Sequence, residues 1–360
     1  MKRPSIHQIL VSAAEGDAVT RMALNLRDEL RGHCDSEVYA YWRHGDAMEK
    51  ECLSLDDLPQ SEDVSVLVYH LSIGWKPVSE LIHSRTERLV IAYHNVTPSH
   101  FYEEHQPEFA ADLRLGRSDL LQLADRAVLA LADSKFNAME LEAAGFRDTR
   151  VVPAGLKVDR LVRLETIPSI VQDTGRRFPE GYVVAVGQVL PHKRIEQLLQ
   201  TMHLLNTTRW GNVGLVVCGV ARQVGYLEAL HRFRAVTPMA NVHFTGPVSD
   251  RALATYVRGA RAFLGMSDHE GYCIPPLEAA AVGVPVVIKG AAAVPETVQG
   301  AGIVLPEGAG PCEASEALAM VLDEDEVRWR LIDAGYSRIA DIDANDDVRE
   351  SARILIEVAK

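Results

Sequence analysis

Short apolar runs alternate with amphipathic segments along most of the chain. Apolar runs between polar or glycine-rich stretches are typical of buried strands, and apolar positions three or four residues apart are typical of helices. In the first half, this pattern predicts strands at 6–11, 37–41, 64–69, 89–93, 127–132 and 150–152, and helices at 18–31, 77–84, 117–123 and 136–144. Such alternation predicts a parallel sheet covered by helices on both faces.

The second half repeats the pattern. It predicts strands at 182–186, 213–218, 242–244, 262–265, 284–288 and 302–305, helices at 195–205, 226–233 and 250–258, and further helices within 313–360. Residues 156–180 contain Pro168, Gly175 and Pro179 with little apolar periodicity, which predicts an interdomain segment. We therefore expect two α/β domains, residues 1–165 and 166–344.

Composition narrows the function classes. The chain has 360 residues and a formal net charge of −13, which argues against a general nucleic-acid binder. No stretch approaches the roughly 20 apolar residues of a membrane helix. The N-terminus is expected to be a strand and not a signal peptide. Five cysteines without a C-x-x-C motif indicate free thiols and a cytoplasmic protein.

Two glutamates lie eight positions apart around a predicted helix start. Glu270 is expected on the loop after strand 262–265, and Glu278 in the first turn of a helix over 277–282 opened by Pro276. A helix N-terminus suits a phosphate, and carboxylates accept hydrogen bonds from sugar hydroxyls, so this stretch suits a nucleotide-sugar. Alone, the pair is explained equally well by a helix-dipole contact of Glu278 and a solvated Glu270.

Loops after other predicted strands supply further candidates, because ligands of parallel sheets bind beyond the carboxyl ends of strands. Lys193, before helix 195–205, could neutralise a diphosphate. His94 and Asn95 follow strand 89–93 in a loop that could line a ligand cleft. The alternative is that these two residues only cap the loop. Gly16 allows a tight turn, and Asp17 is at least as well explained by capping a helix as by touching a substrate. His70, in the expected loop 69–75, is a weaker candidate.

Several of these motifs resemble those of known enzymes. The stretch HEGYCIPPLEAAAVGVPVV resembles the E-x7-E region of retaining GT-B glycosyltransferases, above all glycosyltransferase family 4. The chain also contains that family's Y-H-N-x-T-P, G-x-x-x-P-x-K and G-x-V-S-D segments in order, beginning at Tyr93, Gly187 and Gly246. The resemblance implies a GT-B fold, in which two Rossmann-like parallel-sheet domains face each other across a cleft. It also implies that the last helix, about 345–360, returns to the first domain.

The resemblance implies roles for single residues. His94 would lie beside the sugar, where its neutral imidazole or its backbone carbonyl could hold the sugar or steady positive charge at the reacting carbon. Glu270 would hold the donor sugar, and Glu278 would bind the ribose. Backbone near Val248 would meet the base. The residues expected around the diphosphate, or in the loop facing donor and acceptor, are Lys193, Gly271, Tyr272, Cys273, Ile274, Gly16, Asp17 and Asn95. Many family members carry arginine where this chain has Gln188, so the diphosphate clamp departs from the pattern. No metal or other cofactor is expected.

The implied function is transfer of a hexosyl group from a UDP- or GDP-sugar to a carbohydrate or lipid-linked saccharide, in polysaccharide or glycoconjugate biosynthesis. A GT-B sugar-nucleotide epimerase and a catalytically silent sugar-nucleotide-binding subunit are the alternatives. Arginines on the first helix leave peripheral contact with the inner membrane face open, although interleaved acidic residues favour a solvated face.

Overall fold

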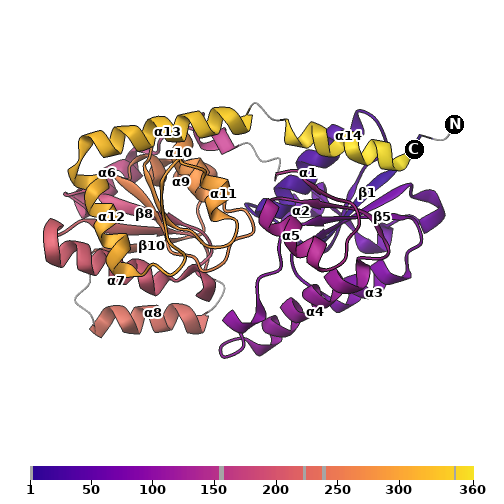
Figure 1. The fold of residues 1–360 in the computed structure, drawn as a ribbon, viewed down its shortest axis with the longest axis horizontal. Helices are drawn as coiled ribbons and strands as arrows, with labels where there is room; N and C mark the ends of the chain where they lie inside the picture. Colours follow the sequence, from indigo (N-terminus) through magenta and orange to yellow (C-terminus); the bar gives the residue numbers. More distant parts are fainter. Residues whose placement is uncertain (1–2, 154–157, 222–223, 237–240, 344–345) are drawn as a thin grey trace. The chain divides into compact units, whose positions relative to one another are not determined.

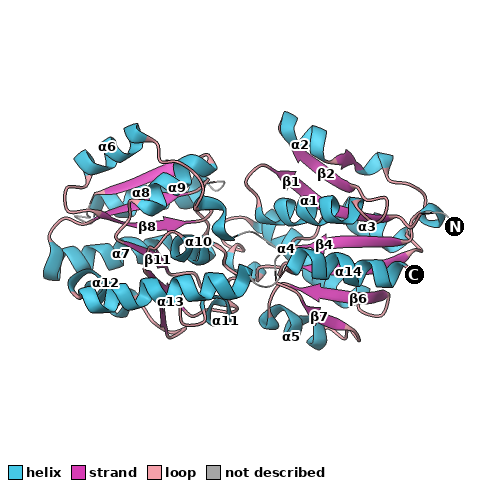
Figure 2. Ribbon diagram, turned by 90° about the horizontal axis from the view of Figure 1, so that it is seen from above, coloured by secondary structure: helices cyan, strands magenta, loops and turns pink. Residues whose placement is uncertain are grey.

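The chain folds into two compact units. The computed structural model describes residues 3–153, 158–221, 224–236, 241–343 and 346–360 (Figure 1). The first unit comprises Met1–Leu156 and Asp346–Lys360, and the second comprises Lys157–Asn345. Each unit is a parallel sheet with helices packed against it (Figure 2). In the described part of the chain, no helix combines the length and the apolar character needed to cross a membrane.

The sheet of the first unit has seven strands in the order β3-β2-β1-β4-β5-β6-β7. Its strands are β1 (Ile6–Ala14), β2 (Val38–His44), β3 (Leu53–Ser54), β4 (Val66–Leu71), β5 (Arg88–Tyr93), β6 (Ala127–Ala132) and β7 (Thr149–Val151). All of the pairings are parallel. The strand order reverses between β1 and β4, so the loops after these strands diverge there, as at the ligand sites of many α/β sheets.

Helices cover both faces of this sheet. They are α1 (Ala18–Arg31), α2 (Asp46–Glu51), α3 (Lys76–Ser84), α4 (Pro107–Leu123), α5 (Lys135–Ala143) and α14 (Asp347–Ala359). The last helix, α14, packs against α1 and buries Ala352, Ile354 and Leu355 in the core of the first unit. The C-terminal helix is therefore part of the first unit's hydrophobic core.

The second unit has a six-stranded sheet in the order β10-β9-β8-β11-β12-β13. Its strands are β8 (Tyr182–Val186), β9 (Gly214–Cys218), β10 (Val242–Gly246), β11 (Ala262–Gly265), β12 (Val286–Lys289) and β13 (Ile303–Leu305). The α-helices are α6 (Pro168–Arg177), α7 (Ile195–Leu205), α8 (Val224–Val236), α9 (Asp250–Arg258), α10 (Pro275–Ala281), α11 (Val294–Val298), α12 (Pro311–Asp323) and α13 (Asp325–Asp343). Here the strand order reverses between β8 and β11.

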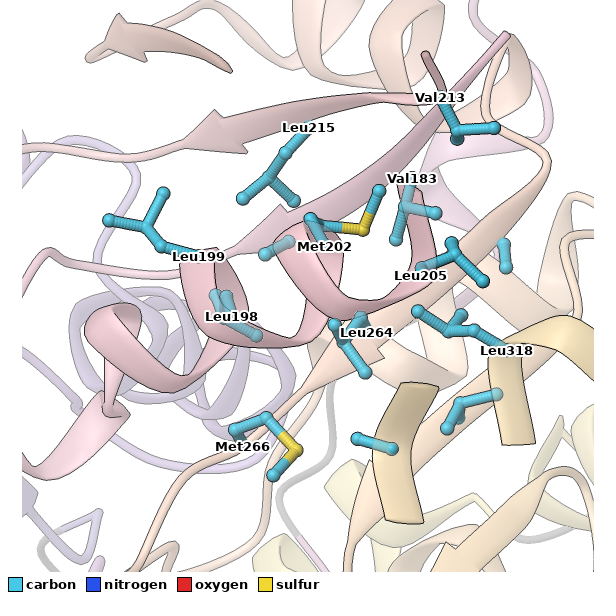
Figure 3. Close-up of a cluster of buried hydrophobic side chains, with 14 of the residues drawn as sticks. Val183, Leu198, Leu199, Met202, Leu205, Val213, Leu215, Leu264, Met266 and Leu318 are labelled. Atoms are coloured by element: carbon cyan, nitrogen blue, oxygen red, sulfur yellow. The ribbon is translucent and has the colours of Figure 1, made fainter. Parts of the chain in front are cut away.

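Both faces of this second sheet are buried, which explains its continuous apolar strands. Figure 3 shows one face, where Leu198, Met202 and Leu205 of α7 pack with Val183 of β8 and Leu264 of β11. The neighbouring strand positions belong to the opposite core, which contains Val184, Val216 and Phe263. The two cores fix the carboxyl ends of β8 and β11, which carry the candidate site.

The expected start of a helix at residue 117 is wrong, because helix α4 begins earlier in the chain. It starts at Pro107, which occupies the first turn, and it continues through Gly116. A Cβ atom on Gly116 would lie 2.6 Å from the backbone nitrogen of Gly74, so this glycine allows two backbones to approach closely. The expected helix began just after this glycine, which is instead a packing residue inside the helix.

The described part of the expected interdomain segment 156–180, residues 158–180, is largely structured and belongs to the second unit. The first two residues of the segment lie outside the described part of the chain. Residues Val158–Leu161 form a 3-10 turn, η4, whose Val158 and Leu161 are buried in the second unit's core. Helix α6 follows, with Pro168 at its N-terminus and most of its surface exposed. A mostly solvated helix has few apolar positions, so its periodicity was too weak to detect.

Three strands of the first unit, β1, β2 and β4, run further than expected, and β2 extends to His44. Strand β1 continues to Ala14, so only the last part of the expected loop 12–17 lies outside it. Strand β4 continues to Leu71, so His70 belongs to a buried strand and not to the loop after it.

Candidate active site

The loops after β8 and β11 meet where the strand order of the second unit reverses. Lys193 ends a 3-10 turn, η5 (Pro191–Lys193), and its Nζ donates to Oε1 of Glu270 at 2.6 Å. The backbone N–H of Asp268 donates to the carbonyl of His192 at 2.8 Å and joins the two loops. The structure thus brings two predicted site residues, 77 positions apart in sequence, into direct contact.

This ion pair is charged at neutral pH. Burial alone would raise the pKa of Glu270, but the neighbouring Lys193 ammonium outweighs burial and holds that pKa below its usual value. Conversely, burial would lower the pKa of Lys193, and the Glu270 carboxylate raises it above its usual value. Burial lowers the pKa of the adjacent His192 to about 3, so this imidazole is neutral.

A second set of charges stabilises the same loop. Asp268 accepts from Nζ of Lys289 at 2.5 Å, and its other carboxylate oxygen accepts from Nε of Arg194. Arg194 has a left-handed backbone, φ 51°, immediately before α7. Its side chain is engaged by Asp268, so Arg194 does not take the place of the arginine that Gln188 replaces.

A pocket opens beside the ion pair. Polar lining comes from Gln188, Lys193, Ser267 and Glu270, and an apolar floor comes from residues of β8, β11 and β12. Cys273 also lines the pocket, with φ 73°. Burial, followed by the Glu270 charge, raises the pKa of the Cys273 thiol well above its usual value, so the thiol is neutral. Gln188 therefore lines this pocket as a neutral amide.

Glu278 lies in the first turn of α10 and is 4% exposed. Its carboxylate accepts from Nε of Arg160 in η4, and Arg160 also pairs with Asp250 at 2.5 Å. Helix α10 starts at Pro275, one residue before the expected Pro276. The Arg160 pairing was not predicted, since the two residues are 118 positions apart.

The remaining candidates of the second unit are backbone positions. Tyr272 packs against the apolar core, and its carbonyl accepts from Oγ1 of Thr297 at 2.5 Å. Gly271 and Ile274 flank Tyr272 and Cys273, and Ile274 is the residue before α10. Val248 packs against the same core, and the next residue, Ser249, caps α9 by accepting from the N–H of Ala252.

Gly219 directly follows β9 and packs closely against the loop after β8. A Cβ atom there would lie 1.9 Å from the Gly187 carbonyl oxygen, and Gly219 has φ 154°. We expect Gly219→Ala to lower the free energy of unfolding by about 1–3 kcal/mol and to weaken nucleotide binding. Urea unfolding and nucleotide-induced thermal shifts would measure both effects. Gly225→Ala is the control, because nothing lies within 4 Å of its Cβ position; equal stability of the two variants would contradict the prediction.

In the first unit, the candidate residues Asp17 and Asn95 form hydrogen bonds to other residues of the same unit. Asp17 caps α1 by accepting from the N–H of Thr20 at 2.8 Å, after Gly16 with φ 78°. The amide nitrogen of Asn95 donates to Asn137 at 2.9 Å and to Glu140 at 2.7 Å, both on α5. Asn95 is 7% exposed, so this amide is engaged inside the unit.

Both ring nitrogens of His94 are engaged as well. Its Nδ1 lies 2.8 Å from Oδ2 of Asp133, and its Nε2 lies 2.8 Å from Nδ1 of His70. His94 follows β5 directly, Asp133 follows β6 directly, and His70 lies in β4. The ring therefore offers no nitrogen for a neutral imidazole contact to a sugar, which was one expected role of this residue. Its backbone carbonyl, the other expected contact, is compatible with this arrangement.

Sequence reasoning missed the partners that set these charges: Asp133, Arg160, Asp268 and Lys289. Each is a single polar residue at the end of a strand or within a turn, and no local motif marks its partner. Within the described residues, no group of three or more His, Cys, Asp or Glu side chains could hold a metal ion.

Comparisons with known proteins agree with this geometry. Residues 167–338 match the family described as Glycosyl transferases group 1. The chain is 28% identical to O-antigen chain mannosyltransferase B of Escherichia coli over 256 residues, which cover 69% of this chain and 64% of that protein. It is 27% identical to a GDP-mannose-dependent alpha-mannosyltransferase of Mycobacterium tuberculosis over 211 residues, which cover 57% and 50%. The aligned region thus spans less than two thirds of the length of either relative.

Solved structures show the same fold over nearly the whole chain. Sucrose-phosphate synthase from Thermosynechococcus elongatus superposes with a TM-score of 0.73 at 16% identity, covering 99% of both chains. HepE of Anabaena in complex with UDP-glucose superposes with a TM-score of 0.71 at 17% identity, covering 98% of both. The chain therefore has the GT-B fold, and the match of its second unit to the group 1 glycosyl transferases supports glycosyl transfer as its class of reaction.

Proposed function

We propose that this protein is a retaining glycosyltransferase of family 4. It would move a hexosyl group from a nucleotide-sugar to a hydroxyl of a carbohydrate or lipid-linked saccharide, in polysaccharide or glycoconjugate biosynthesis in the cytoplasm. The observation that carries the proposal is the Lys193–Glu270 ion pair. It lines a pocket at the reversal point of the second sheet, within the region that matches the group 1 glycosyl transferases.

The chemistry of the paired residues suits the two ends of a nucleotide-sugar. The Lys193 ammonium would neutralise negative charge that builds up on the departing diphosphate. The Glu270 carboxylate would accept hydrogen bonds from sugar hydroxyls. Glu270 keeps Lys193 protonated, and Lys193 keeps Glu270 ionised, so neither residue needs to change its charge when a donor enters. Such preorganised charge is the main source of catalysis in sites of this kind.

The donor is proposed from the relatives. Two relatives are named as mannosyltransferases, one of them dependent on GDP-mannose, and a structural neighbour was solved with UDP-glucose. GDP-mannose is therefore the first donor to test and UDP-glucose the second. Gln188 would affect the binding of either donor, because an amide donates hydrogen bonds to a diphosphate without adding positive charge.

Thermal shifts with GDP, GDP-mannose, UDP and UDP-glucose test the donor site. A ligand that binds only the folded state raises the melting temperature according to its occupancy. We expect one nucleotide family to raise it, and Lys193→Met to lose most of that shift relative to its own unliganded value. Lys76→Ala is the control, because Lys76 is an exposed lysine of α3. The absence of any shift at saturating nucleotide would contradict the proposal.

Product analysis tests the reaction itself. With the donor found above and a saccharide acceptor, NMR of the new glycosidic bond is expected to show the same anomeric configuration as the donor. An inverted linkage would contradict retention, and isomerised donor without a new glycoside would indicate an epimerase.

A further inference from the structure

Four polar groups form a continuous chain through the first unit. The Gln8 amide nitrogen donates to the Ala23 carbonyl at 3.0 Å, and its Oε1 lies 2.8 Å from Nε2 of His70. His70 contacts His94, and His94 contacts Asp133, each at 2.8 Å. The two imidazole planes are inclined by only 7°, with their ring centroids 5.1 Å apart. Gln8 and His70 are buried, at 0% and 3% exposure.

The number of protons in this chain can be counted. Both ends, the Ala23 carbonyl and the Asp133 carboxylate, are acceptors, and four contacts link them. Each contact needs one proton between its two heavy atoms, because two lone pairs at 2.8 Å repel each other. The Gln8 amide supplies one proton along the chain in either of its orientations, and each neutral imidazole supplies one. Two neutral imidazoles beside an ionised Asp133 therefore leave one contact without a proton.

We propose that Asp133 is a positioning residue that holds the missing proton on His94, so that His94 is an imidazolium at neutral pH. Of the groups in the chain, His94 is the base in direct contact with the carboxylate. An imidazole is also a far stronger base than a carboxylate, which places the proton on the ring and not on Asp133. His70 is the neutral member, with its Nε2–H donated to Gln8 and its Nδ1 accepting from His94.

The surroundings agree with this assignment. Burial, followed by the charge of His94, lowers the pKa of His70 well below its usual value. A pocket borders His70, His94 and Asp133. The rest of its lining comes from apolar residues of α1, β5 and β6 and of the segment just after β7, with Val348 and Ser351 of α14. Asp133 and His70 are thus the only titratable side chains beside His94 in that lining of the described residues.

The charge state determines what His94 can do. An imidazolium has no lone pair, so His94 cannot take a proton from an acceptor hydroxyl. It is instead a fixed positive charge at the carboxyl end of the sheet, and it anchors the loop that starts at Asn95. The charge assignment rests on the geometry of the first unit alone, whereas its use in sugar transfer rests on the proposed function.

Nitrogen NMR of 15N-histidine-labelled full-length protein tests the assignment directly. The His94 signals would be identified by their loss in His94→Gln. We expect both His94 ring nitrogens to show the protonated shift at neutral pH, and one to move to the unprotonated shift in Asp133→Asn. In that variant the side-chain amide introduced at position 133 supplies the fourth proton, so a neutral His94 completes the chain. A neutral His94 in the wild type, or an unchanged His94 in Asp133→Asn, would overturn the proposal.

Two further variants keep the test decisive. Asp148→Asn removes an exposed carboxylate of the same unit and is expected to leave the His94 signals unchanged. His70→Gln preserves the proton count, because an amide also supplies one proton along the chain, so His94 is expected to stay an imidazolium. A neutral His94 in His70→Gln would contradict the count even if Asp133→Asn failed to fold. Because the readout is spectroscopic, it stands whether or not sugar transfer is observed.

Discussion

Replacing Lys193 by methionine is expected to lower the rate of sugar transfer by about 10²–10³-fold, the usual cost of removing one preorganised electrostatic contact. Methionine keeps much of the side-chain volume and removes only the charge. Glu270 then becomes a largely buried carboxylate, 11% exposed, without its 2.6 Å partner, so the free energy of unfolding is also expected to fall, by about 3 kcal/mol. Donor-saturated transfer rates and urea unfolding measure the two effects separately.

The double variant Lys193→Met/Glu270→Gln separates catalysis from folding. Removing both charges leaves no uncompensated carboxylate, so much of the lost stability is expected to return while transfer stays low. Recovery of transfer together with stability would show that the pair is structural, and the proposed role of Lys193 would be wrong.

Replacing Glu278 by glutamine is expected to weaken donor binding by about 10- to 100-fold, which corresponds to one hydrogen bond to a charged group at about 1.5–3 kcal/mol. An amide still fills the site but accepts less strongly from ribose hydroxyls. Titration calorimetry with the nucleoside diphosphate alone measures the effect without an acceptor.

Arg160→Leu is the matched control for Glu278, because it removes the partner and leaves the carboxylate. Its loss of stability is expected to reach about 3 kcal/mol, since Glu278 is 4% exposed and would be unpaired. Donor affinity is expected to stay within about tenfold of the wild type. If Glu278→Gln bound the nucleotide as tightly as the wild type did, its role would be limited to holding Arg160.

Much of the second unit could be predicted from sequence because its strands are buried on both faces. Strands β8 and β11 and helices α7 and α9 have the predicted bounds. Fully apolar runs mark the two strands, and a serine cap marks the start of α9. The contact between Lys193 and Glu270 is consistent with both lying in loops after neighbouring strands of one parallel sheet.

What sequence could not provide is the choice of partners. A carboxylate reads the same in sequence whether it meets a ribose, an arginine or an imidazole. Glu278 pairs with Arg160 across 118 positions, and His94 pairs with Asp133 across 39. Only the folded sheet brings these residues together. Helix α6 and the start of α4 were missed for a different reason, because exposure and a packing glycine hide helical periodicity.

The charges around Asp268 also bear on how a donor would arrive. Lys193, Arg194 and Lys289 pair with Glu270, Asp268 and Glu196, so the charges of this corner cancel within a chain of net charge −13. At physiological ionic strength the field of the whole protein extends only about 8 Å. An anionic donor would therefore be repelled at long range by the net charge, and the Lys193 ammonium would act on it only at close range. Added salt should screen the repulsion first, so donor association should quicken as ionic strength rises, the reverse of ordinary electrostatic steering.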